Sequence, residues 1–313
     1  MSLLQSIQII GLVGPTAVGK TEIAIQLAQA WGIPVVSCDS MQIYRYLDIG
    51  TAKPSRETLG QVPHRMIDIV NLDEFFDADM YREAAAKEVN TILLQGKPAL
   101  VCGGTGFYFR ALVDGLFESI KIPRDFREEL VLRWDSLSNL ELYYLLETTD
   151  PAAAGKIHAN DRKRVFRALE VHAFTGKKIS EFHQEHEQLP KPFKTLIFGI
   201  HLPREELYER IDQRVEQMMK SGWIEEVEQL RKQGYSPQLR SMQGLGYKQI
   251  NLFLDQQISK PQMVEAICQD TRHYAKRQLT WFRADTRIHW IDTGKIDAFN
   301  TITESVLKAL EHS

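Results

Sequence analysis

Cysteine is scarce in this sequence, and the few cysteines that it has are not grouped. The chain contains three among 313 residues, Cys38, Cys102 and Cys268, and no two of them form a C-x-x-C pair. A disulfide framework and a cysteine-based zinc site both need such grouping. Both are therefore excluded, and we expect a reducing, cytoplasmic location.

Long apolar runs are missing as well. No stretch approaches the roughly 18 apolar residues of a membrane span. No charged segment precedes the first apolar stretch, which has the length of a strand, so we expect no signal peptide. A membrane is accordingly not among the expected partners.

An excess of positive charge is also absent, since the formal net charge is −3. Any contact with nucleic acid must therefore come from a local basic patch and not from the overall field. The chain has no internal repeat and no low-complexity tract, and its 43% hydrophobic and 25% charged residues are ordinary for a globular protein. Its length suggests about two domains.

The most informative stretch that is present runs from Ile7 to Thr21. Residues 7–13 form an apolar, β-branched run of strand length, and residues 14–21 match G-x-x-x-x-G-K-[ST]. Glycines allow backbone N–H groups to turn toward an anion, the lysine adds a positive charge, and the threonine hydroxyl can hold Mg²⁺. A helical pattern follows, so the anion would lie at a helix N-terminus. The residues predicted to bind a di- or triphosphate are Gly14, Pro15, Thr16, Ala17, Val18, Gly19, Lys20 and Thr21.

Strand-like and helical patterns alternate along much of the chain. Residues 34–38, 98–102, 195–202 and 288–291 resemble strands, and residues 80–94, 204–221 and 298–310 resemble helices. Such alternation predicts a parallel sheet with right-handed crossovers. Between residues 121 and 192 only helical patterns occur, and residues 156–178 are locally basic. We therefore expect a P-loop NTPase-like α/β core at residues 1–120 and 193–313, with an all-helical insertion domain at residues 121–192.

Two polar residues follow strands in this predicted sheet. Asp39 comes directly after the strand at residues 34–38, and Thr105 lies in the glycine loop that follows residues 98–102. Ligands of parallel sheets bind at the carboxyl ends of the strands, so we expect both residues to share a crevice with the phosphate loop. A carboxylate in that position acts either as a magnesium ligand or as a general base, although an Asp-Ser pair can also simply form a turn.

Asp39 also begins a longer recognisable segment. Residues 39–54, D-S-M-Q-I-Y-R-Y-L-D-I-G-T-A-K-P, resemble the segment D-S-x-x-x-Y-x-x-(M/L)-D-I-G-T-A-K-P of the tRNA dimethylallyltransferases. The resemblance continues through residues 63–68, 103–108, 158–170, 246–249 and 274–283. The chain lacks the zinc finger of eukaryotic members and is similar to the bacterial form. At residues 243–248 it has Q-G-L-G-Y-K where some members have R-C-x-G-Y-R.

The resemblance implies an activity. A dimethylallyl group would pass from dimethylallyl diphosphate to N6 of adenosine 37, next to the anticodon, with Asp39 as general base. The phosphate loop, Arg214 and Mg²⁺ on Thr21 would hold the diphosphate. The implied partners are the donor and the tRNA anticodon stem-loop, and we expect a monomer. The residues implied in tRNA binding are Asp39, Ser40, Met41, Gln42, Thr105, Arg127, Lys163, Arg164, Val165, Phe166 and Arg167.

Some of these residues also have an ordinary structural interpretation. Arg214 lies on an amphipathic helix, where an arginine is usually part of a solvated face. Arg164 and Arg167 lie three residues apart on a basic helix, which suits contacts with phosphates but also suits a solvated face. Tyr274 and Trp281 are interpreted as core, because aromatic residues at helical spacing usually pack inside a protein.

Two other functions use part of the same pattern. A phosphate-loop kinase would also use Lys20, Thr21 and Asp39, and residues 162–167 could form its arginine-rich lid, but it has no counterpart of residues 39–54. A nucleotide-controlled RNA-binding module would catalyse no reaction. It therefore would not explain why Lys20, Asp39 and Thr105 are predicted to converge where a substrate would lie. The transferase is the function that we expect.

Overall fold

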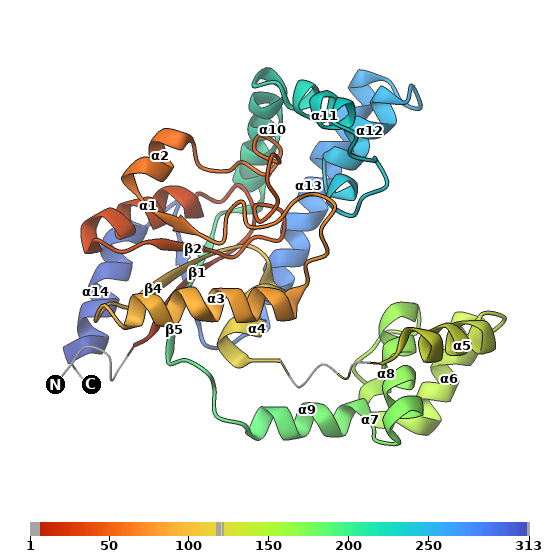
Figure 1. Cartoon of the computed structure of the whole chain (residues 1–313). Helices are drawn as coiled ribbons and strands as arrows, with labels where there is room; N and C mark the ends of the chain where they lie inside the picture. The colour runs from red at the N-terminus through yellow and green to blue at the C-terminus, as the bar shows by residue number, and fades with distance from the viewer. Residues whose placement is uncertain (1–6, 117–119, 121, 312–313) are drawn as a thin grey trace. The chain divides into compact units, whose positions relative to one another are not determined.

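The computed structural model describes residues 7–116, 120 and 122–311. Its centre is a six-stranded sheet of order β3-β2-β4-β1-β5-β6, in which every pair of neighbouring strands is parallel (Figure 1). The strands are β1 (Ile9–Val13), β2 (Val35–Ser37), β3 (His64–Arg65), β4 (Ala99–Gly103), β5 (Thr195–His201) and β6 (Ile288–Asp292). The predicted parallel α/β fold is confirmed; only the two-residue edge strand β3 was not anticipated.

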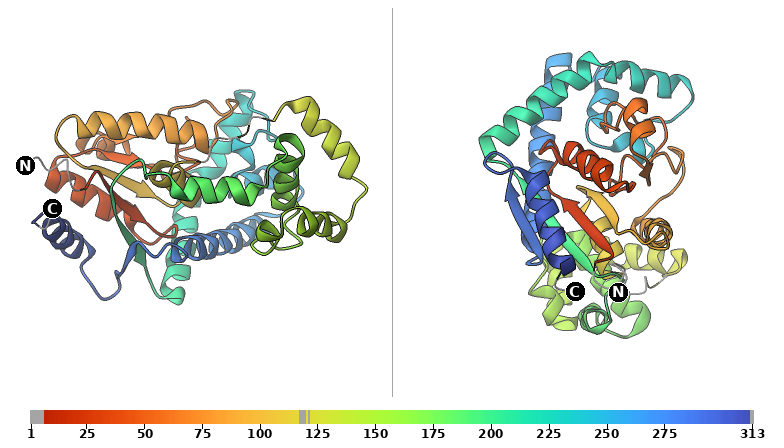
Figure 2. Two further views of the ribbon diagram at one scale, coloured as in Figure 1. Left: turned by 90° about the horizontal axis from the view of Figure 1, so that it is seen from below. Right: turned by 90° about the vertical axis from the view of Figure 1, so that its left-hand side faces the viewer.

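Helices cover both faces of the sheet (Figure 2). On one face, α1 (Lys20–Trp31) packs against β1 and β4, and α14 (Ala298–Glu311) packs against α1 and β5; alternate residues of β1, Ile10 and Leu12, belong to the apolar core on this face. The other face carries α3 (Ala78–Leu93) and α4 (Gly106–Asp114). On that face a Cβ added to Gly11 would lie 2.6 Å from the ring of Phe109, so the glycine allows α4 to approach β1 closely. Strands buried on both faces explain the continuous apolar runs in the sequence.

The remaining helices beside the sheet surround the carboxyl ends of its strands or lie at its edge. They are α2 (Arg56–Gln61), α10 (Arg204–Lys220), α11 (Trp223–Lys232), the short 3₁₀ helix η2 (Ser241–Gln243), α12 (Tyr247–Leu254) and α13 (Lys260–Arg283). Helix α10 packs against α13, and α11 against α12. Helix α13 begins with a capping box, in which Ser259 accepts from the N–H of Gln262 and the Gln262 side chain accepts from the N–H of Ser259.

Contacts divide the chain into two units, Met1–Asp114 with Pro192–Ser313, and Gly115–Lys191. The second unit consists of α5 (Arg124–Trp134), α6 (Asn139–Thr149), α7 (Pro151–Ala154), α8 (Arg162–Thr175) and α9 (Ile179–Gln188), and no strand occurs in its described residues. It has its own apolar core. Asp150, which is 1% exposed, accepts from the N–H groups of Ala153 and Ser180 and thereby joins α7 to α9. The predicted boundary at residue 121 lies outside the described residues.

None of the helices in the described ranges combines the length and apolar character that crossing a membrane requires.

Residues 39–54 form an irregular segment that α11 holds in place. The carboxylate of Glu226 accepts hydrogen bonds from the N–H of Asp48 at 3.0 Å and of Ile49 at 2.7 Å. It also accepts one from the hydroxyl of Tyr247 at 2.7 Å. Because backbone donors outside a sheet must find other partners, this carboxylate takes the place of a neighbouring strand.

Trp223 fills the space between two glycines of the recognised motifs. It is 1% exposed, and a Cβ added to Gly50 would lie 2.1 Å from its Nε1 atom. A Cβ added to Gly246, whose φ is +84°, would lie 2.0 Å from its Cη2 atom. Both positions therefore require glycine for the tryptophan to fit.

Lys53, the lysine of the T-A-K-P motif, is also structural. Its Nζ atom donates to the carbonyl of Tyr44 at 2.7 Å and to the carboxylates of Asp48 at 2.7 Å and Asp68 at 2.5 Å. The side chain is 4% exposed. All three N–H donors of the buried ammonium are thus used within the protein.

We expect Gly50→Ala to lower the free energy of unfolding by about 1–3 kcal/mol, because the added methyl group overlaps Trp223. The control is Gly60→Ala in α2, where no atom lies within 4 Å of the added Cβ. Alanine inside a helix should stabilise that variant by roughly 0.5–1 kcal/mol. Urea unfolding measures both effects. Equal stability of the two variants would contradict the packing described for Trp223.

Candidate active site

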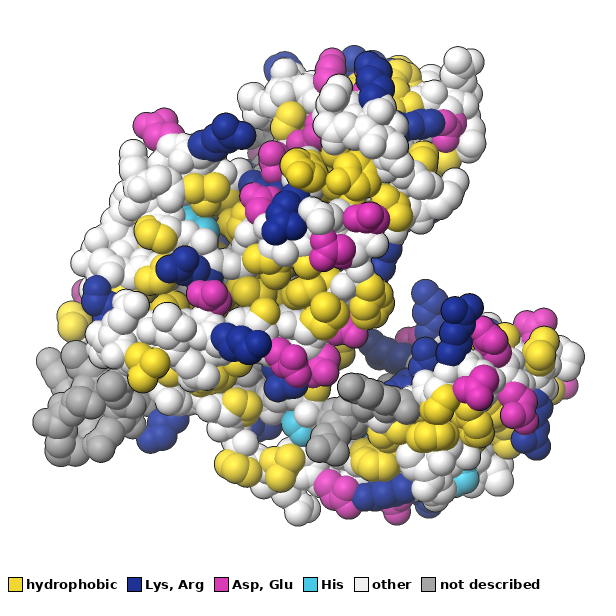
Figure 3. All heavy atoms as spheres, in the orientation of Figure 1, with side chains coloured by type: hydrophobic (Ala, Val, Ile, Leu, Met, Phe, Trp, Pro, Cys, Tyr) yellow, Lys and Arg dark blue, Asp and Glu magenta, His cyan; other side chains and the backbone are white. Residues whose placement is uncertain are grey.

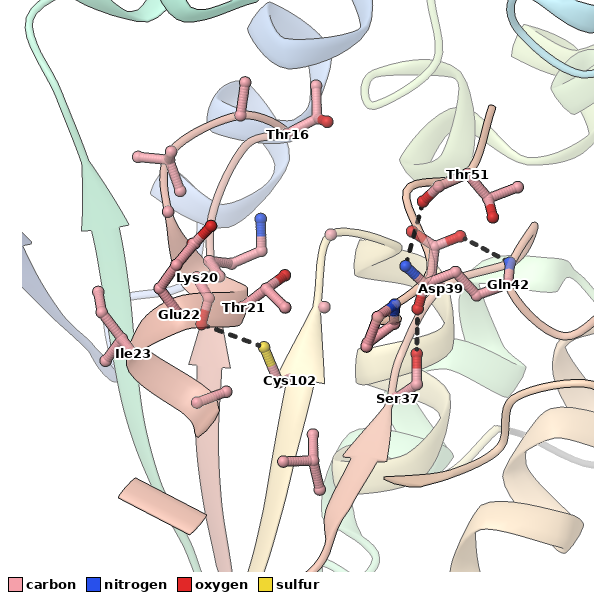
Figure 4. Close-up of a pocket in the computed structure, with 18 of the residues that line it drawn as sticks. Thr16, Lys20, Thr21, Glu22, Ile23, Ser37, Asp39, Gln42, Thr51 and Cys102 are labelled. Atoms are coloured by element: carbon pink, nitrogen blue, oxygen red, sulfur yellow. Dashed lines mark hydrogen bonds between the residues drawn. The ribbon is translucent and has the colours of Figure 1, made fainter. Parts of the chain in front are cut away.

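Three loops at the carboxyl ends of β1, β2 and β4 line one pocket of about 580 Å³. Figure 4 shows Thr16, Lys20 and Thr21 of the phosphate loop on one side of it, and Asp39 and Gln42 on the other. A second cavity of about 310 Å³ shares Thr16, Asp39, Arg214 and Tyr274 with the first, so the two adjoin. Asp39 thus shares a crevice with the phosphate loop, as the sequence pattern predicted, whereas Thr105 lines neither cavity.

The phosphate loop has the backbone geometry of an anion site. Gly14 has φ +146°, and a Cβ there would lie 2.4 Å from the carbonyl oxygen of Ile200 on β5. Gly19, with φ 96°, precedes α1, and no side chain caps the start of that helix. The first N–H groups of α1 are therefore available to a bound anion, which the helix dipole also favours.

Lys20 points along this loop and is affected by its surroundings. Its Nζ atom donates to the carbonyl of Pro15 at 2.6 Å. The pKa of Lys20 is lowered to about 8, mainly by burial and also by the charge of Arg214, whereas Cys102, Asp39 and Glu22 act in the opposite direction. An incoming anion would favour the charged form of this lysine.

Arg214 of α10 lies in the pocket with Lys20 and Asp39. Burial lowers the pKa of Arg214, and the carboxylates of Asp39 and Glu22 partly compensate. The interpretation of this residue as part of a solvated face is therefore wrong. Arg210, one turn earlier, also lines the pocket but pairs with Glu206 at 2.8 Å.

The two carboxylate oxygens of Asp39 differ: Oδ1 accepts hydrogen bonds from the backbone, and Oδ2 accepts none from the described residues. Its Oδ1 atom accepts from the N–H groups of Met41 at 2.8 Å and Gln42 at 3.2 Å, which is an Asx turn. No hydrogen bond to Oδ2 occurs among the described residues, and the carboxylate lines both cavities. The side chain of Gln42 is bound within the protein, to the hydroxyl of Ser37 at 3.0 Å and the carbonyl of Thr51 at 3.1 Å.

Thr105 joins the loop after β4 to the loop after β2. Its hydroxyl oxygen accepts from the N–H of Ser40 at 3.0 Å, and its own N–H donates to the carbonyl of Cys38 at 3.2 Å. Thr105 also lies near the hydroxyl of Tyr274 and acts to lower the pKa of that tyrosine. Ser40 and Met41 line the smaller cavity. Within the protein, Thr105 therefore fixes the position of the Asp39 loop.

Helix α13 contributes residues that the sequence did not reveal. Tyr274 lies in the wall of both cavities, so its interpretation as core is wrong, and burial raises its pKa well above the usual tyrosine value. Gln278 is 6% exposed and contacts two of the strand-end loops. Trp281 packs against Gly106, where a Cβ would lie 2.2 Å from its ring. Tyr274, Gln278 and Trp281 lie on one face of the helix. Two polar residues on a face that would otherwise be apolar could have indicated that this face lines a pocket.

In the helical unit, Glu170 organises two of the predicted RNA-binding arginines. It is 1% exposed and pairs with Arg127 of α5 and with Arg167 of α8, the latter at 2.7 Å. Burial alone would raise the pKa of Glu170, but hydrogen bonds from the two guanidinium groups outweigh it and hold the pKa below its usual value. Arg167 and Arg127 are thus ordered by a carboxylate of their own unit.

The other predicted residues of α8 separate into exposed and buried ones. Lys163 and Arg164 are exposed, and Arg164 pairs with Asp161 at 3.3 Å. Figure 3 shows Lys and Arg side chains gathered on one side of this unit. Val165 is 0% exposed and packs in the core of the unit, so its side chain is not available for the predicted contact with tRNA in this structure. Phe166 packs against Trp134, with ring centroids 5.3 Å apart.

The pocket offers oxygen ligands suited to Mg²⁺. The exposed Thr21 hydroxyl and the carboxylates of Glu22 and Asp39 line it. Across the described ranges, no group of three or more His, Cys, Asp or Glu side chains could hold a metal alone. The donors fit an ion that completes its coordination with phosphate oxygens and water, as Mg²⁺ does.

The geometry agrees with comparisons to known proteins. The IPP transferase family model matches residues 42–285. The tRNA dimethylallyltransferase 2 of Geotalea uraniireducens is 44% identical over 302 residues, which cover 96% of this chain and 97% of the relative. The tRNA dimethylallyltransferase of Geobacter sulfurreducens is 44% identical over 290 residues, covering 92% and 93%.

Solved structures give the same result. The tRNA delta(2)-isopentenylpyrophosphate transferase of Staphylococcus epidermidis has a TM-score of 0.72 at 36% identity and covers 98% of this chain and 100% of its own. A eukaryotic dimethylallyltransferase acting on tRNA has a TM-score of 0.79 at 28% identity, covering 98% and 79%. The chain belongs to the IPP transferase family. It is an enzyme of the tRNA dimethylallyltransferase class, as the resemblance of residues 39–54 implied.

The pKa of Lys20 predicts how diphosphate binding depends on pH. Below about pH 8 the free ammonium is charged, and above it the lysine becomes neutral, so affinity for inorganic diphosphate should fall as the pH rises from 8 to 10. The loss should approach about tenfold per pH unit, because one proton is then taken up on binding.

Lys20→Arg is the control, because arginine stays charged throughout this range. Titration of the ligand itself affects both proteins equally. Calorimetric titrations at several pH values should therefore give a steeper decline for the wild type, and parallel profiles would show that Lys20 is not the titrating group.

Proposed function

We propose that this chain transfers the dimethylallyl group of dimethylallyl diphosphate to N6 of adenosine 37 in tRNA and releases diphosphate. The observation that carries the proposal is the arrangement of one pocket: an open carboxylate oxygen of Asp39 faces a phosphate loop with two cations, Lys20 and Arg214. A tRNA acceptor also suits the expected cytoplasmic location.

In the proposed reaction, the bond between C1 of the donor and the diphosphate oxygen breaks, and its electrons leave with the diphosphate. N6 of the adenine forms the new bond to C1 and loses a proton to Oδ2 of Asp39. The Asx turn to Met41 and Gln42 holds the carboxylate in a fixed orientation. A general base positioned in this way contributes roughly 10²–10⁴-fold to a rate.

The leaving diphosphate gains negative charge as the bond breaks. The N-terminus of α1, Lys20 and Arg214 offer fixed positive potential at the place where this charge develops. Mg²⁺, held by Thr21 and by diphosphate oxygens, would neutralise a further part of it. The backbone N–H groups of the loop are already oriented before the donor binds, which is the condition for strong electrostatic stabilisation.

The acceptor base must leave the stacked anticodon loop to reach Asp39. The smaller cavity supports this step, because it adjoins Asp39 and is lined by Ser40 and Met41, two residues implied in tRNA binding. Arg277 of α13 also lines it and adds a positive charge beside the proposed base pocket. On the helical unit, the exposed Lys163 and Arg164 would contact phosphates of the anticodon stem.

The assay that tests the function incubates the protein with dimethylallyl diphosphate or with ATP, each with and without tRNA, and identifies the products by mass. The proposal requires one prenyl group on tRNA and released diphosphate. Transfer of phosphate from ATP to a hydroxyl compound would favour a kinase instead.

Asp39→Asn should lower kcat by at least about a hundredfold with little change in KM, because the amide keeps the Asx turn but cannot accept the proton. Asp73→Asn, which changes an exposed aspartate, is the matched control. Single-turnover transfer measures the chemical step. Chemistry in Asp39→Asn at a near-normal rate would exclude Asp39 as the base.

The double variant Lys163→Ala with Arg164→Ala should weaken tRNA binding and reduce its salt dependence, while donor binding stays unchanged. Each lost phosphate contact lowers the slope of log affinity against log salt by roughly 0.7–1. Arg167 is left intact, because its loss would also remove a partner of buried Glu170. The control, Lys87→Ala with Lys97→Ala, removes two charges from the α/β unit. Equal slopes for both double variants would mean that tRNA is bound elsewhere.

A further inference from the structure

In the phosphate loop, both polar groups of the peptide between Pro15 and Thr16 are hydrogen-bonded to side chains. Its carbonyl accepts from Nζ of Lys20 at 2.6 Å, and its N–H donates to Oε1 of Gln278 at 2.8 Å. No peptide bond in the described residues is cis. In a trans peptide the C=O and N–H groups point in opposite directions within the peptide plane, so Lys20 and Gln278 lie at opposite edges of this peptide.

The other end of the Gln278 amide contacts a second strand-end loop. Its Nε2 atom donates to the carbonyl of Gly104 at 2.8 Å. A Cβ added to Gly104 would lie 2.2 Å from that same nitrogen, so the glycine is needed for the contact. The next residue is Thr105, which bonds to Ser40 beside Asp39. Gln278 therefore links the phosphate loop to the loop that positions the proposed base.

The amide side chain of Gln278 satisfies both contacts. The N–H of Thr16 needs an acceptor and the carbonyl of Gly104 needs a donor, and glutamine provides one of each. An ionised glutamate has no hydrogen-bond donor. A methionine, which is similar in size, has no donor and only a weak acceptor. The side chain is 6% exposed, so water does not readily replace the lost partners.

We propose that Gln278 is a positioning residue for diphosphate binding, which acts by fixing the orientation of the Pro15–Thr16 peptide. With the N–H of Thr16 turned toward Gln278, the carbonyl of Pro15 is turned toward Lys20, whose ammonium offsets the partial negative charge of this oxygen. A released peptide can rotate and present its carbonyl oxygen to the diphosphate, which repels it. The inference rests on the proposed function only in taking the phosphate loop as the diphosphate site.

Gln278→Met tests the proposal, because it removes both hydrogen bonds at nearly constant volume. We expect the Kd for inorganic diphosphate to rise about 5- to 30-fold, which corresponds to one or two lost hydrogen bonds, and the Kd for tRNA to stay unchanged. Gln269→Met, an exposed glutamine on the same helix, is the matched control and should bind like the wild type. Titrations are made well below the unfolding temperature of each protein.

A variant that loses thermal stability but binds diphosphate as tightly as the wild type would show a purely structural role and overturn the proposal.

A second measurement needs no variant. In the wild type, the amide hydrogen of Thr16 should exchange slowly without ligand and no more slowly with diphosphate. Fast exchange that slows only when diphosphate is added would identify this N–H as a phosphate ligand and would also overturn the proposal. Neither measurement requires prenyl transfer, so a failed transfer assay counts against the proposed function alone.

Discussion

The pocket depends on how closely backbone segments approach one another at the carboxyl ends of neighbouring strands. A Cβ on Gly103 would lie 2.0 Å from the carbonyl oxygen of Cys38, and one on Gly14 would lie 2.4 Å from that of Ile200. Glycine at these points lets the loops after β1, β2 and β4 share one space. The polar groups that those loops carry, above all Lys20 and Asp39, are brought together for this reason, and the larger side chains of α13 close the wall behind them.

Charge is the second constraint on this site. Lys20 and Arg214 line the same pocket, and burial lowers the pKa of each of them; the charge of Arg214 also lowers the pKa of Lys20. Asp39 and Glu22 compensate only partly. Two neighbouring cations repel each other, and the proposed diphosphate would relieve this repulsion; a site built in this way would favour a leaving group whose charge increases during the reaction.

The local parts of this arrangement could be predicted from the sequence. The strand, glycine loop and helix around Lys20 lie within one short stretch, and Asp39 follows an apolar strand, so the rule for parallel sheets placed it correctly at the pocket. Thr105 also follows a strand but does not line the pocket; it contacts the Asp39 loop instead. Contacts between distant segments could not be predicted: the hydrogen bond from Thr16 to Gln278 spans 262 positions. Helical spacing likewise suggested which face of α8 is basic, but it did not show that Val165 is buried or that Arg167 pairs with Glu170.

The central claim is that opposite sides of one pocket bind different substrates, the donor at the phosphate loop and the acceptor base at Asp39. Competition binding tests it most directly, in the Asp39→Asn variant so that the donor is not consumed, with labelled dimethylallyl diphosphate displaced by inorganic diphosphate or by an unmodified anticodon stem-loop. The account predicts that inorganic diphosphate displaces the donor and that the stem-loop does not. Displacement of the donor by the stem-loop, with no competition from diphosphate, would contradict it.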